Sequence, residues 1–433
     1  MKVLLLNQCF RPDVVATAQQ LTDLAAGLVE RGHDVTVVCS DRGYDDPLVR
    51  FPQRERSNNV EIIRVPSIRA NKNSRWRRAV NFASFSIACA FRLGVLPRQD
   101  AVVALTSPPL ISWLASWFTR LKGGRMIFWV MDLNPDEAIA AGWLKQESLT
   151  AKMLGALLQS SMRRAEKIVV LDRFVKQRIV AKGIPEEKID VITPWSHDDA
   201  VRFDEVGREA FRRAHSLAGK FVVMYAGNHS PCHPLDTVLR AAQELRARDD
   251  IVFCFAGGGS EQNKVHEFAR GNRLKNVLCL PYQPIEKLSA LLSAADLHVV
   301  VMGEKFAGIV HPSKIYNILA IGSPFLYIGP MQSHMGGIIA RLGYRDSAFH
   351  ADHGEIDLVA QMIADRADRF LAEREPYSLA AAGGSVKRQP PLAQEFSKAV
   401  LLPRLVAHVE AFCARATEEK IEPSATKLQS AVR

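Results

Sequence analysis

Residues 221–236 read FVVMYAGNHSPCHPLD, and this stretch decides the fold of the chain. An apolar run, Phe221–Tyr225, ends in a turn that contains Gly227, and a predicted helix follows from Asp236 to Leu245. A short apolar run without polar alternation indicates a strand that is covered on both faces. A strand that leads through a glycine turn into a helix is the first unit of a parallel α/β domain.

Short apolar strands alternate with helical segments along most of the chain, in two successive series. The first series has a helix at Ala18–Arg31 with one apolar stripe, and Thr17 with Gln20 forms a capping box at its start. Its predicted strands are Val3–Leu6, Val35–Cys39, Glu61–Val65, Ala101–Leu105, Met126–Val130, Lys167–Leu171 and Ile189–Thr193. The second series adds strands at Ile251–Phe255, Val277–Leu280, Leu297–Val301 and Phe325–Ile328, and helices at Glu261–Arg270, Ile285–Ser293 and Ser313–Ala320. This alternation predicts two parallel sheets with helices on both faces.

The two series predict an α/β protein with two Rossmann-like doubly wound domains. The first spans residues 1–194, the second spans 218–390, and a polar stretch at 195–217 is the expected linker. A C-terminal helix is expected at 391–416, able to pack back on the first domain, before a polar tail at 417–433. Ligands of such sheets bind outside the carboxyl ends of the strands, so we expect the site in a cleft between the domains.

The bulk composition restricts where the protein works. The chain has 433 residues, 48% of them hydrophobic, and no apolar run approaches the roughly 20 residues of a membrane span. The apolar start, Met1–Leu6, is too short for a secretory signal because polar Asn7 and Gln8 follow it. The seven cysteines are scattered without a Cys-x-x-Cys pair, which favours the reducing cytoplasm and argues against a zinc site. We therefore expect a cytoplasmic protein that needs no metal or other cofactor.

Two glycine-containing strand ends of the second domain are candidates for binding a phosphate ester. The first is the turn within Tyr225–Asp236, for which an ordinary connection between strand and helix is the alternative. The second contains Gly257 and Gly258 and follows the next strand, although it lacks the Gly-x-Gly-x-x-Gly spacing of dinucleotide sites. Glycines at such positions let the backbone approach a ligand, or merely allow a turn.

A third candidate runs from Phe306 to Pro324. It places Ser313 and Lys314 at the expected start of a helix, and Gly322 then ends that helix before a strand. An ammonium group beside the free N–H groups of a helix start is suited to holding a diphosphate.

Six motifs extend these candidates along the chain: Arg31–Val38, Thr106–Pro109, Asp132–Asp136, Tyr225–Asn228, Pro281–Tyr282 with Ala294–Asp296, and Pro312–Lys314 through Gly322–Pro324. With them the chain resembles glycosyltransferase family 4, the retaining enzymes of GT-B fold in bacterial surface-polysaccharide synthesis. It is most similar to the branch with the amino-sugar transferases of O-antigen assembly, over roughly residues 1–410. Each motif is weak alone, but together, in family order, they are specific for the superfamily and much less so for the substrate.

The resemblance implies that the second domain binds a nucleoside diphosphate sugar, with UDP as the expected nucleotide. Many family members hold the diphosphate with Arg and Lys after the first strand of this domain, where this chain has Asn228 and His233. We therefore expect Lys314 and helix N-termini to carry more of the charge. The implied donor-binding residues are Gly227, Asn228, His233, Gly257, Gly258, Tyr282, Gly308, Ser313, Lys314 and Asn317.

The chain departs from the family at two acidic positions before the last Gly-x-Pro. The family glutamate that usually contacts the donor ribose aligns with Asn317, and the other one aligns with Ile309. Glu304 lies a few residues earlier and is a candidate substitute. An asparagine hydrogen-bonds a ribose hydroxyl less strongly than a carboxylate does. Some relatives of this branch also lack that acid, so its loss does not predict an inactive protein.

The first domain supplies the acceptor-side candidates. Asp132 ends a predicted strand that faces the cleft, where it can orient an acceptor hydroxyl or stabilise positive charge on the sugar, and it is the expected catalytic residue. Its alternative role is to cap the following helix, which Asp136 serves equally well. Asp136 is itself a further acceptor-side candidate. Thr17 and Gln19 lie in the loop after the first strand and match a Thr-Ala-Gln of the branch, with Thr17 also the expected helix cap.

The reaction implied by the resemblance moves a sugar from a nucleoside diphosphate to a hydroxyl of a glycan, with a lipid-linked glycan as the expected acceptor. The family retains the stereochemistry and, in the usual account, needs no covalent nucleophile because the leaving diphosphate takes the acceptor proton. Two alternatives stay open. One is a nucleotide-sugar epimerase of the same architecture, although no dense carboxylate cluster is present. The other is a non-catalytic, transferase-like binding subunit, which the missing glutamates motivate.

The net charge of +10 suits phosphate esters, anionic lipid or nucleic acid. Residues 69–98 contain seven basic and no acidic residues, interleaved with aromatic side chains such as Trp76 and Phe91. Such a stretch is suited to an anionic membrane surface, on the inner face of the cytoplasmic membrane. The alternative is a buried helix at Ala79–Leu96 with a basic loop before it. Because no nucleic-acid-binding motif is present, we expect no nucleic acid partner.

Overall fold

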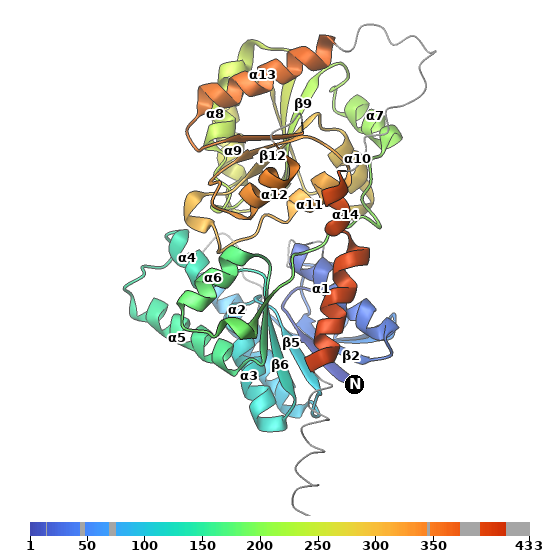
Figure 1. Ribbon diagram of the computed structural model, residues 1–433, viewed down its shortest axis with the longest axis vertical. Coiled ribbons are helices and arrows are strands. Elements are labelled where there is room, and N and C mark those ends of the chain that lie inside the picture. Colours follow the sequence, from blue (N-terminus) through green and yellow to red (C-terminus); the bar gives the residue numbers. More distant parts are fainter. Residues whose placement is uncertain (14, 44–47, 69–74, 344–346, 373–389, 413–433) are drawn as a thin grey trace, which may run out of the picture. The chain divides into compact units, whose positions relative to one another are not determined.

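The computed structural model describes residues 1–13, 15–43, 48–68, 75–343, 347–372 and 390–412. Its internal contacts divide the chain into two compact units (Figure 1). Unit 1 comprises Met1–Thr193 and Ala399–Arg433, and unit 2 comprises Pro194–Lys398. Each unit is a largely parallel sheet flanked by helices, which confirms the predicted fold class of two Rossmann-like α/β domains.

Unit 1 has an eight-stranded sheet in the order β3-β4-β2-β1-β5-β6-β7-β8. Its strands are β1 (Lys2–Leu6), β2 (Asp34–Ser40), β3 (Arg54–Ser57), β4 (Val60–Val65), β5 (Ala101–Ala104), β6 (Arg125–Val130), β7 (Lys167–Val170) and β8 (Ile189–Val191). All neighbours pair in parallel except β3, which runs antiparallel to β4 at the edge. The sequence RERS gives β3 no apolar run, so it lies outside the predicted strands.

Helices cover this sheet: α1 (Ala16–Glu30), α2 (Arg75–Val95), α3 (Ile111–Lys122), α4 (Asp136–Ala140), α5 (Leu149–Arg164) and α6 (Arg173–Ala181). The predicted capping box of α1 is wrong. The N-cap is Val15, whose side chain makes no cap hydrogen bond. Because α1 begins before Thr17, that residue lies inside the first turn and not at the cap.

The expected C-terminal helix at 391–416 is broken into two parts. α14 (Pro391–Glu395) belongs to unit 2, residues 396–397 are not helical, and a second helical stretch spans 398–412. From Ala399 on this stretch belongs to unit 1, where it packs against α1 at Gly27; a Cβ there would lie 3.0 Å from Val406 Cγ2. The Nε2 atom of His33 also lies 2.9 Å from Glu410 Oε1. Residues 413–416 and the expected polar tail at 417–433 lie outside the described residues.

Unit 2 has a six-stranded parallel sheet in the order β11-β10-β9-β12-β13-β14. Its strands are β9 (Phe221–Asn228), β10 (Ile251–Gly258), β11 (Val277–Leu280), β12 (Leu297–Val301), β13 (Phe325–Ile328) and β14 (Ala348–Ala351). The short strand β14 was not among the predicted strands. The strand order reverses between β9 and β12, and ligands of doubly wound sheets bind at such a switch point.

Apolar helix faces cover both sides of the unit 2 sheet. One core cluster joins β9, β10 and β12 to α8 (Asp236–Glu244) and α13 (Ile356–Ala372). A second joins the other face of the sheet to α10 (Leu288–Ser293). The remaining helices are α7 (Glu205–Ala214), α9 (Gln262–Gly271), α11 (Lys314–Ala320) and α12 (His334–Leu342).

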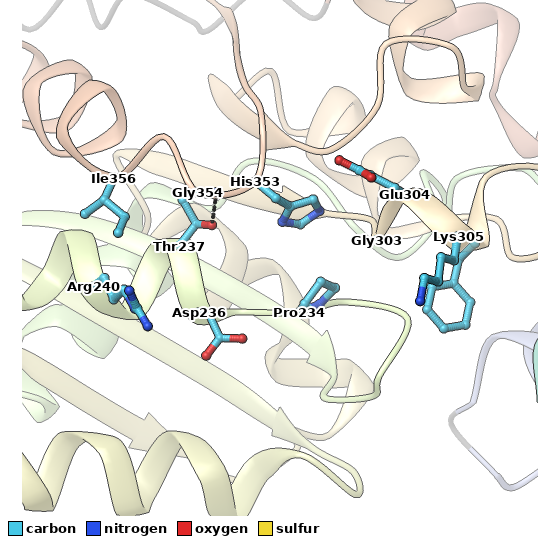
Figure 2. Close-up of a pocket in the computed structure, with 11 residues that line it drawn as sticks. Pro234, Asp236, Thr237, Arg240, Gly303, Glu304, Lys305, His353, Gly354 and Ile356 are labelled. Carbon is cyan, nitrogen blue, oxygen red and sulfur yellow. Dashed lines mark hydrogen bonds between the residues drawn. The ribbon is translucent and has the colours of Figure 1, made fainter. Parts of the chain in front are cut away.

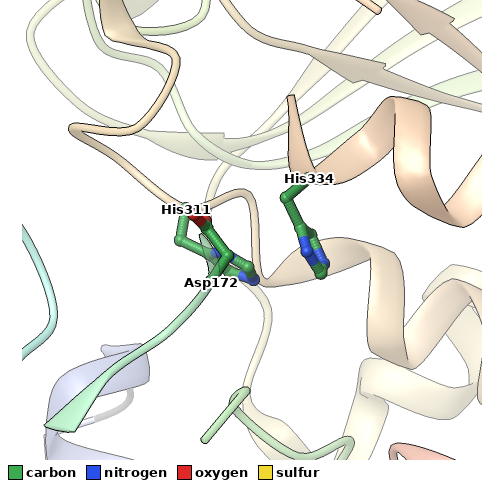
Figure 3. Close-up of side chains that lie close together, drawn as sticks. All are labelled: Asp172, His311 and His334. Atoms are coloured by element: carbon green, nitrogen blue, oxygen red, sulfur yellow. The ribbon is translucent and has the colours of Figure 1, made fainter. Parts of the chain in front are cut away.

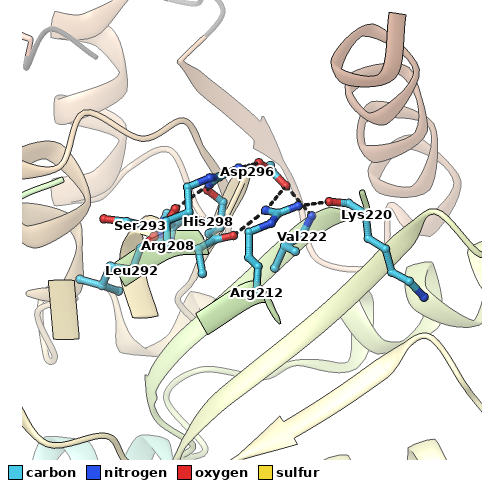
Figure 4. Close-up of polar contacts among 10 residues, drawn as sticks. Arg208, Arg212, Lys220, Val222, Leu292, Ser293, Asp296 and His298 are labelled. Atoms are coloured by element: carbon cyan, nitrogen blue, oxygen red, sulfur yellow. Dashed lines mark hydrogen bonds and ion pairs between the residues drawn. The ribbon is translucent and has the colours of Figure 1, made fainter. Parts of the chain in front are cut away.

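The expected linker at 195–217 is instead part of unit 2, because α7 is fixed to the sheet by a buried ion network (Figure 4). Arg208 Nη2 donates to Asp296 Oδ1 at 2.6 Å, and Arg212 Nη1 donates to Asp296 Oδ2 at 2.9 Å. The same Oδ2 atom accepts from the backbone N–H of Val222 in β9. The two guanidinium groups also donate to the carbonyls of Ser293, Ala294 and Ala295 at the end of α10. Polar residues at 204–214 therefore form a packed helix.

Candidate active site

Gly227 lies near the end of β9, where its φ of +136° favours glycine. A Cβ at this position would lie 3.2 Å from Lys314 Nζ, the first residue of α11. The structure therefore brings two of the predicted donor residues together at the carboxyl edge of unit 2. The absence of a side chain at Gly227 leaves the lysine ammonium open to the β9 turn.

The ammonium group of Lys314 is buried and has no hydrogen-bond partner among the described residues. It lies 3.6 Å from the centroid of the Tyr225 ring, which it contacts as a cation over an aromatic face. Burial lowers the pKa of Lys314 to about 7, because a charged form without a partner is disfavoured away from water. An anion bound here would supply the missing partner.

Two histidines flank this lysine on the turn after β9. His229 is fully buried against the Tyr225 and Phe255 rings, and neither of its ring nitrogens has a hydrogen-bond partner among the described residues. Burial and the neighbouring charge of Lys314 lower the pKa of His229 to about 4. The predicted donor residue His233 is also buried, with Nδ1 at 2.7 Å from the carbonyl oxygen of Val301, and the same two causes lower its pKa to about 3. Both imidazoles are therefore neutral at pH 7.

His229 is a residue that the sequence motifs did not single out. A histidine in a turn carries no spacing signal of its own, and its burial depends on the Tyr225 and Phe255 rings of two neighbouring strands. Its two unpartnered nitrogens now make it a member of the candidate site.

The carboxyl ends of β10 and β11 lie at the same site. Gly257 and Gly258 pair in register with Gly227 and Asn228. The carbonyl of Gly258 accepts from the backbone N–H of His229 at 2.7 Å and from the Tyr282 hydroxyl at 3.3 Å. Asn228 and Tyr282 are themselves exposed at this edge.

The remaining predicted donor residues, Gly308, Ser313 and Asn317, lie in the segment around α11. Gly308 is buried with a φ of +70°, and Ser313 is the N-cap of α11 without a side-chain bond to it. The Oδ1 atom of Asn317 accepts from the backbone N–H of His197 at 3.0 Å. The expected ribose-binding side chain therefore already holds a partner within unit 2.

A pocket of about 480 Å³ opens at the switch point (Figure 2). It is lined by Pro234, Asp236, Thr237, Arg240, Gly303, Glu304, Lys305, Phe306, His353, Gly354 and Ile356. The β9 and β12 loops that form it are tied by a bond from Gly303 N–H to the Cys232 carbonyl at 2.9 Å. Glu304, the candidate substitute for a family glutamate, is exposed on this pocket, whereas Lys314 is not among its lining residues.

His311 and His334 form a second polar group in unit 2, drawn in Figure 3. Their Nε2 atoms lie 2.6 Å and 2.7 Å from the hydroxyl of Tyr316, which stands between them. Asp172, labelled in the same figure, belongs to unit 1, where its Oδ1 accepts from the N–H groups of Phe174 and Val175 and so caps α6.

The acceptor-side candidates lie after the strands of unit 1. Asp132 follows β6, and its backbone N–H donates to Thr106 Oγ1 at 3.4 Å. Burial raises the pKa of Asp132 to about 7, and the charge of Glu137 adds to the rise. Asp136 is the first residue of α4 and does not cap it, because the N-cap position is Pro135; its Oδ1 pairs with Lys182 Nζ at 2.7 Å.

Thr17 and Gln19 are half-buried in the first turn of α1, which follows β1. Their side chains therefore stand on a helix and not in the expected loop. None of the described contacts links them to Asp132.

Comparison with known proteins decides among the classes that this geometry allows. The model of glycosyl transferase 4-like domains matches residues 16–195, and the model of glycosyl transferases group 1 matches residues 207–324. The chain belongs to glycosyltransferase family 4. It is a glycosyltransferase of GT-B fold. This assignment replaces the two alternatives that the sequence left open, a nucleotide-sugar epimerase and a non-catalytic binding subunit.

Two relatives of this family 4 enzyme are named as glycosyltransferases, and one of them is named for colanic acid biosynthesis. It is 23% identical to the putative colanic acid biosynthesis glycosyl transferase WcaI of Escherichia coli (strain K12), over 78% of this chain and 85% of the relative. It is 24% identical to the probable glycosyltransferase WbjE of Pseudomonas aeruginosa, over 71% of this chain and 76% of the relative.

Solved structures share the fold at low identity. Anabaena Alr3699/HepE in complex with UDP aligns with a TM-score of 0.66 at 13% identity, over 95% of this chain and 100% of that one. Sucrose-phosphate synthase from Thermosynechococcus elongatus aligns with a TM-score of 0.70 at 14% identity, over 96% and 100%.

Proposed function

We propose that this family 4 enzyme transfers a sugar from a UDP-linked donor to a hydroxyl of a lipid-linked glycan, with retention at the anomeric carbon. The donor half of this proposal rests on the buried ammonium of Lys314, which lies beside the backbone of Gly227. Among the described residues this ammonium has no hydrogen-bond partner. A group of this kind is stabilised by an anion, and a diphosphate is the anion that every such donor brings.

The surroundings of Lys314 support a diphosphate over a single carboxylate. The neutral imidazole of His229 offers one N–H donor beside Lys314 without adding a full charge. We propose that Lys314 and this imidazole stabilise the leaving diphosphate without a metal ion. The UDP found with the structural relative HepE supports the choice of nucleotide.

The base and ribose are proposed to lie along the neighbouring strand ends. Tyr282 is 38% exposed beside Gly258, where its ring offers a face for a nucleobase. Asn317 is proposed to contact the ribose, since its amide nitrogen is a donor that the bond to His197 does not use. The sugar is proposed to reach Glu304 on the pocket at the switch point.

In the proposed reaction the acceptor oxygen forms a bond to the anomeric carbon while the bond to the diphosphate oxygen breaks. The acceptor proton passes to the leaving diphosphate, so no covalent nucleophile is required. Lys314 stabilises the charge that develops on the leaving group. Asp132 is proposed to orient the acceptor hydroxyl and to stabilise positive charge on the sugar.

A screen of donors tests this proposal. The melting temperature of the full chain is measured with UDP-, GDP-, ADP- and dTDP-sugars, because a ligand that binds the folded state raises it. We expect the largest rise with UDP-sugars. Incubation of the stabilising donor with a lipid-linked glycan should then yield a product with the anomeric configuration of the donor, which NMR measures. A rise with a different nucleotide only, or an inverted product, would overturn the corresponding part.

A further inference from the structure

Helix α2 of unit 1 has an outward stripe made of apolar side chains. Ile87, Phe91 and Val95 are 59%, 77% and 72% exposed, at a spacing of four residues along one helix face. The other exposed residues of its described part are Val80, Ala83, Ala90 and Gly94. The opposite face packs into the core through Phe85, Cys89 and Leu93. A helix that is apolar on both faces is normally covered on both, so the outward stripe indicates a partner.

Two neighbouring helices extend this stripe. α3 contacts both α2 and α5, so it lies between them. Lys122 Nζ donates to the carbonyls of Gly94 and Leu96, at 2.5 Å each, and fixes the end of α3 beside the end of α2. Leu121, next to this lysine, is 77% exposed. On α5, Leu149 and Met153 are 85% and 57% exposed at the same four-residue spacing.

The charge of these three helices is of one sign. They contain nine Lys or Arg residues and no Asp or Glu, and the residues are Arg75, Arg77, Arg78, Arg92, Arg120, Lys122, Lys152, Arg163 and Arg164. The whole chain has 46 acidic residues, so their absence from all three of these helices points to an anionic partner. Apolar side chains flanked by basic ones match the boundary between headgroups and acyl chains in an anionic bilayer.

We propose that the α2–α3–α5 face, defined by Ile87, Phe91, Val95, Leu121, Leu149 and Met153, docks on an anionic lipid surface. The apolar stripe enters the headgroup boundary, and the exposed basic residues Arg120, Lys152 and Arg163 contact lipid phosphates. This deepens the function proposed above by naming the surface through which a lipid-linked acceptor is approached. It also relocates the membrane contact expected at residues 69–98, of which 69–74 lie outside the described residues, to the described part of α2 and its two neighbours.

The mode of contact follows from the helix lengths and composition. Among the described residues, no helix is both long and apolar enough to cross a bilayer. In the proposed contact the α2–α3–α5 face therefore rests on the surface of the bilayer. Its affinity for the membrane depends on both apolar and electrostatic contributions. Each basic residue near an anionic surface contributes about fivefold in partitioning, and salt weakens that contribution.

Co-sedimentation with vesicles of anionic phosphatidylglycerol, at low and high salt, tests the proposal with the full chain. The variant Phe91→Glu/Val95→Glu changes two exposed side chains and leaves the buried face of α2 intact. We expect its partitioning to fall at least tenfold. The control Val206→Glu, at a 79% exposed position of α7 in unit 2, should partition like the wild type. The charge contribution is tested by Arg120→Ser/Lys152→Ser, which should weaken binding at low salt and less at high salt.

Equal partitioning of the wild type and Phe91→Glu/Val95→Glu, or no binding of the wild type to anionic vesicles, would overturn the proposal. Light scattering without vesicles distinguishes a second copy of the chain as the occupant: a wild-type dimer that Phe91→Glu/Val95→Glu makes monomeric would also overturn it. UDP binding is measured on each variant as a check of folding. Because vesicle binding needs no turnover, its failure is separable from failure of the proposed transfer reaction.

Discussion

The two units carry the same sheet topology around a switch point, which lies between β1 and β5 in unit 1 and between β9 and β12 in unit 2. They differ in the ionisable group at the carboxyl edge, an acid in unit 1 and a base in unit 2. In unit 1, burial raises the pKa of the Asp132 carboxyl to about 7. In unit 2, burial lowers the pKa of the Lys314 ammonium to about 7. The same desolvation acts on both groups, because it disfavours whichever form is charged.

The difference teaches that the fold places a site and the side chains decide its ligand. An edge with a buried ammonium and neutral imidazoles is suited to an anion, whereas an edge with a protonatable carboxyl is suited to a hydroxyl or to developing positive charge. A donor diphosphate and an acceptor hydroxyl need these two environments. The predictions below test whether the two edges act separately.

The largest effect is expected at Asp296, which fixes β12 and therefore the switch point of unit 2. Asp296→Ala leaves Arg208 and Arg212 buried without their carboxylate and should lower the free energy of unfolding of unit 2 by about 3–5 kcal/mol. Asp368→Ala removes an exposed partner of Arg248 and should change it by less than about 1 kcal/mol. Hydrogen exchange followed by mass spectrometry should show loss of protection in β9 and β12 but not in β1 and β5. Equal protection in both variants would make the network dispensable.

Asp132 should affect turnover more than donor binding. Asp132→Asn removes the charge at the edge of unit 1 and should lower kcat at least ~100-fold, with unchanged affinity for UDP. The matched control is Asp136→Asn, four residues along the chain from Asp132. It breaks the pair with Lys182 and should lower kcat by less than about threefold. Steady-state kinetics with saturating donor give both values. Near-normal turnover in Asp132→Asn would reduce this residue to a structural role.

The lowered pKa of Lys314 predicts a pH dependence of donor binding. A diphosphate binds the charged lysine, which in the free protein loses its proton as pH rises through about 7. Affinity for UDP should therefore fall by up to about tenfold per pH unit between pH 7 and 9, above the range in which the terminal phosphate itself ionises. Lys314→Ala should bind weakly but with a flat profile. A flat profile in the wild type would show that the ammonium keeps its charge without a ligand.

The smallest effect is expected at Asn317. Asn317→Glu restores the residue type that the family often has, and a carboxylate oxygen can also accept from the backbone N–H of His197. UDP affinity should stay within about threefold of the wild type or become tighter. A complex structure with residue 317 remote from the ribose would show that the alignment with the family glutamate is wrong.

The strands that the sequence predicts are those in which apolar runs are buried on both faces, such as β1 and β12. β3 is charged and pairs antiparallel at an edge, and so gives no such signal. In the sequence, helix α7 resembles a polar linker because the side chains that it buries include two arginines. Their partner Asp296 lies more than 80 residues further along the chain. A sequence pattern identifies apolar burial and cannot reveal burial that depends on a distant ion pair.

The candidate site divides in the same way. Gly227 and Lys314 could be predicted because a glycine turn and a helix start carry local signals, and the structure places them side by side. His229 could not, since its burial depends on rings from two strands. The role of Asn317 at the ribose is predicted from the family resemblance alone. No local sequence pattern predicts its bond to the backbone of His197.

Titration calorimetry of UDP at pH 7 tests the central claim, that the edge of unit 2 holds the donor through Lys314. Lys314→Ala should lose roughly 2 kcal/mol of binding free energy, or about 30-fold in Kd, the scale of a charged hydrogen bond left unmade. Lys264→Ala, an exposed lysine of α9, and Asp132→Asn should both bind UDP like the wild type. Wild-type affinity in Lys314→Ala, or an equal loss in Asp132→Asn, would contradict the separation of donor and acceptor chemistry between the two units.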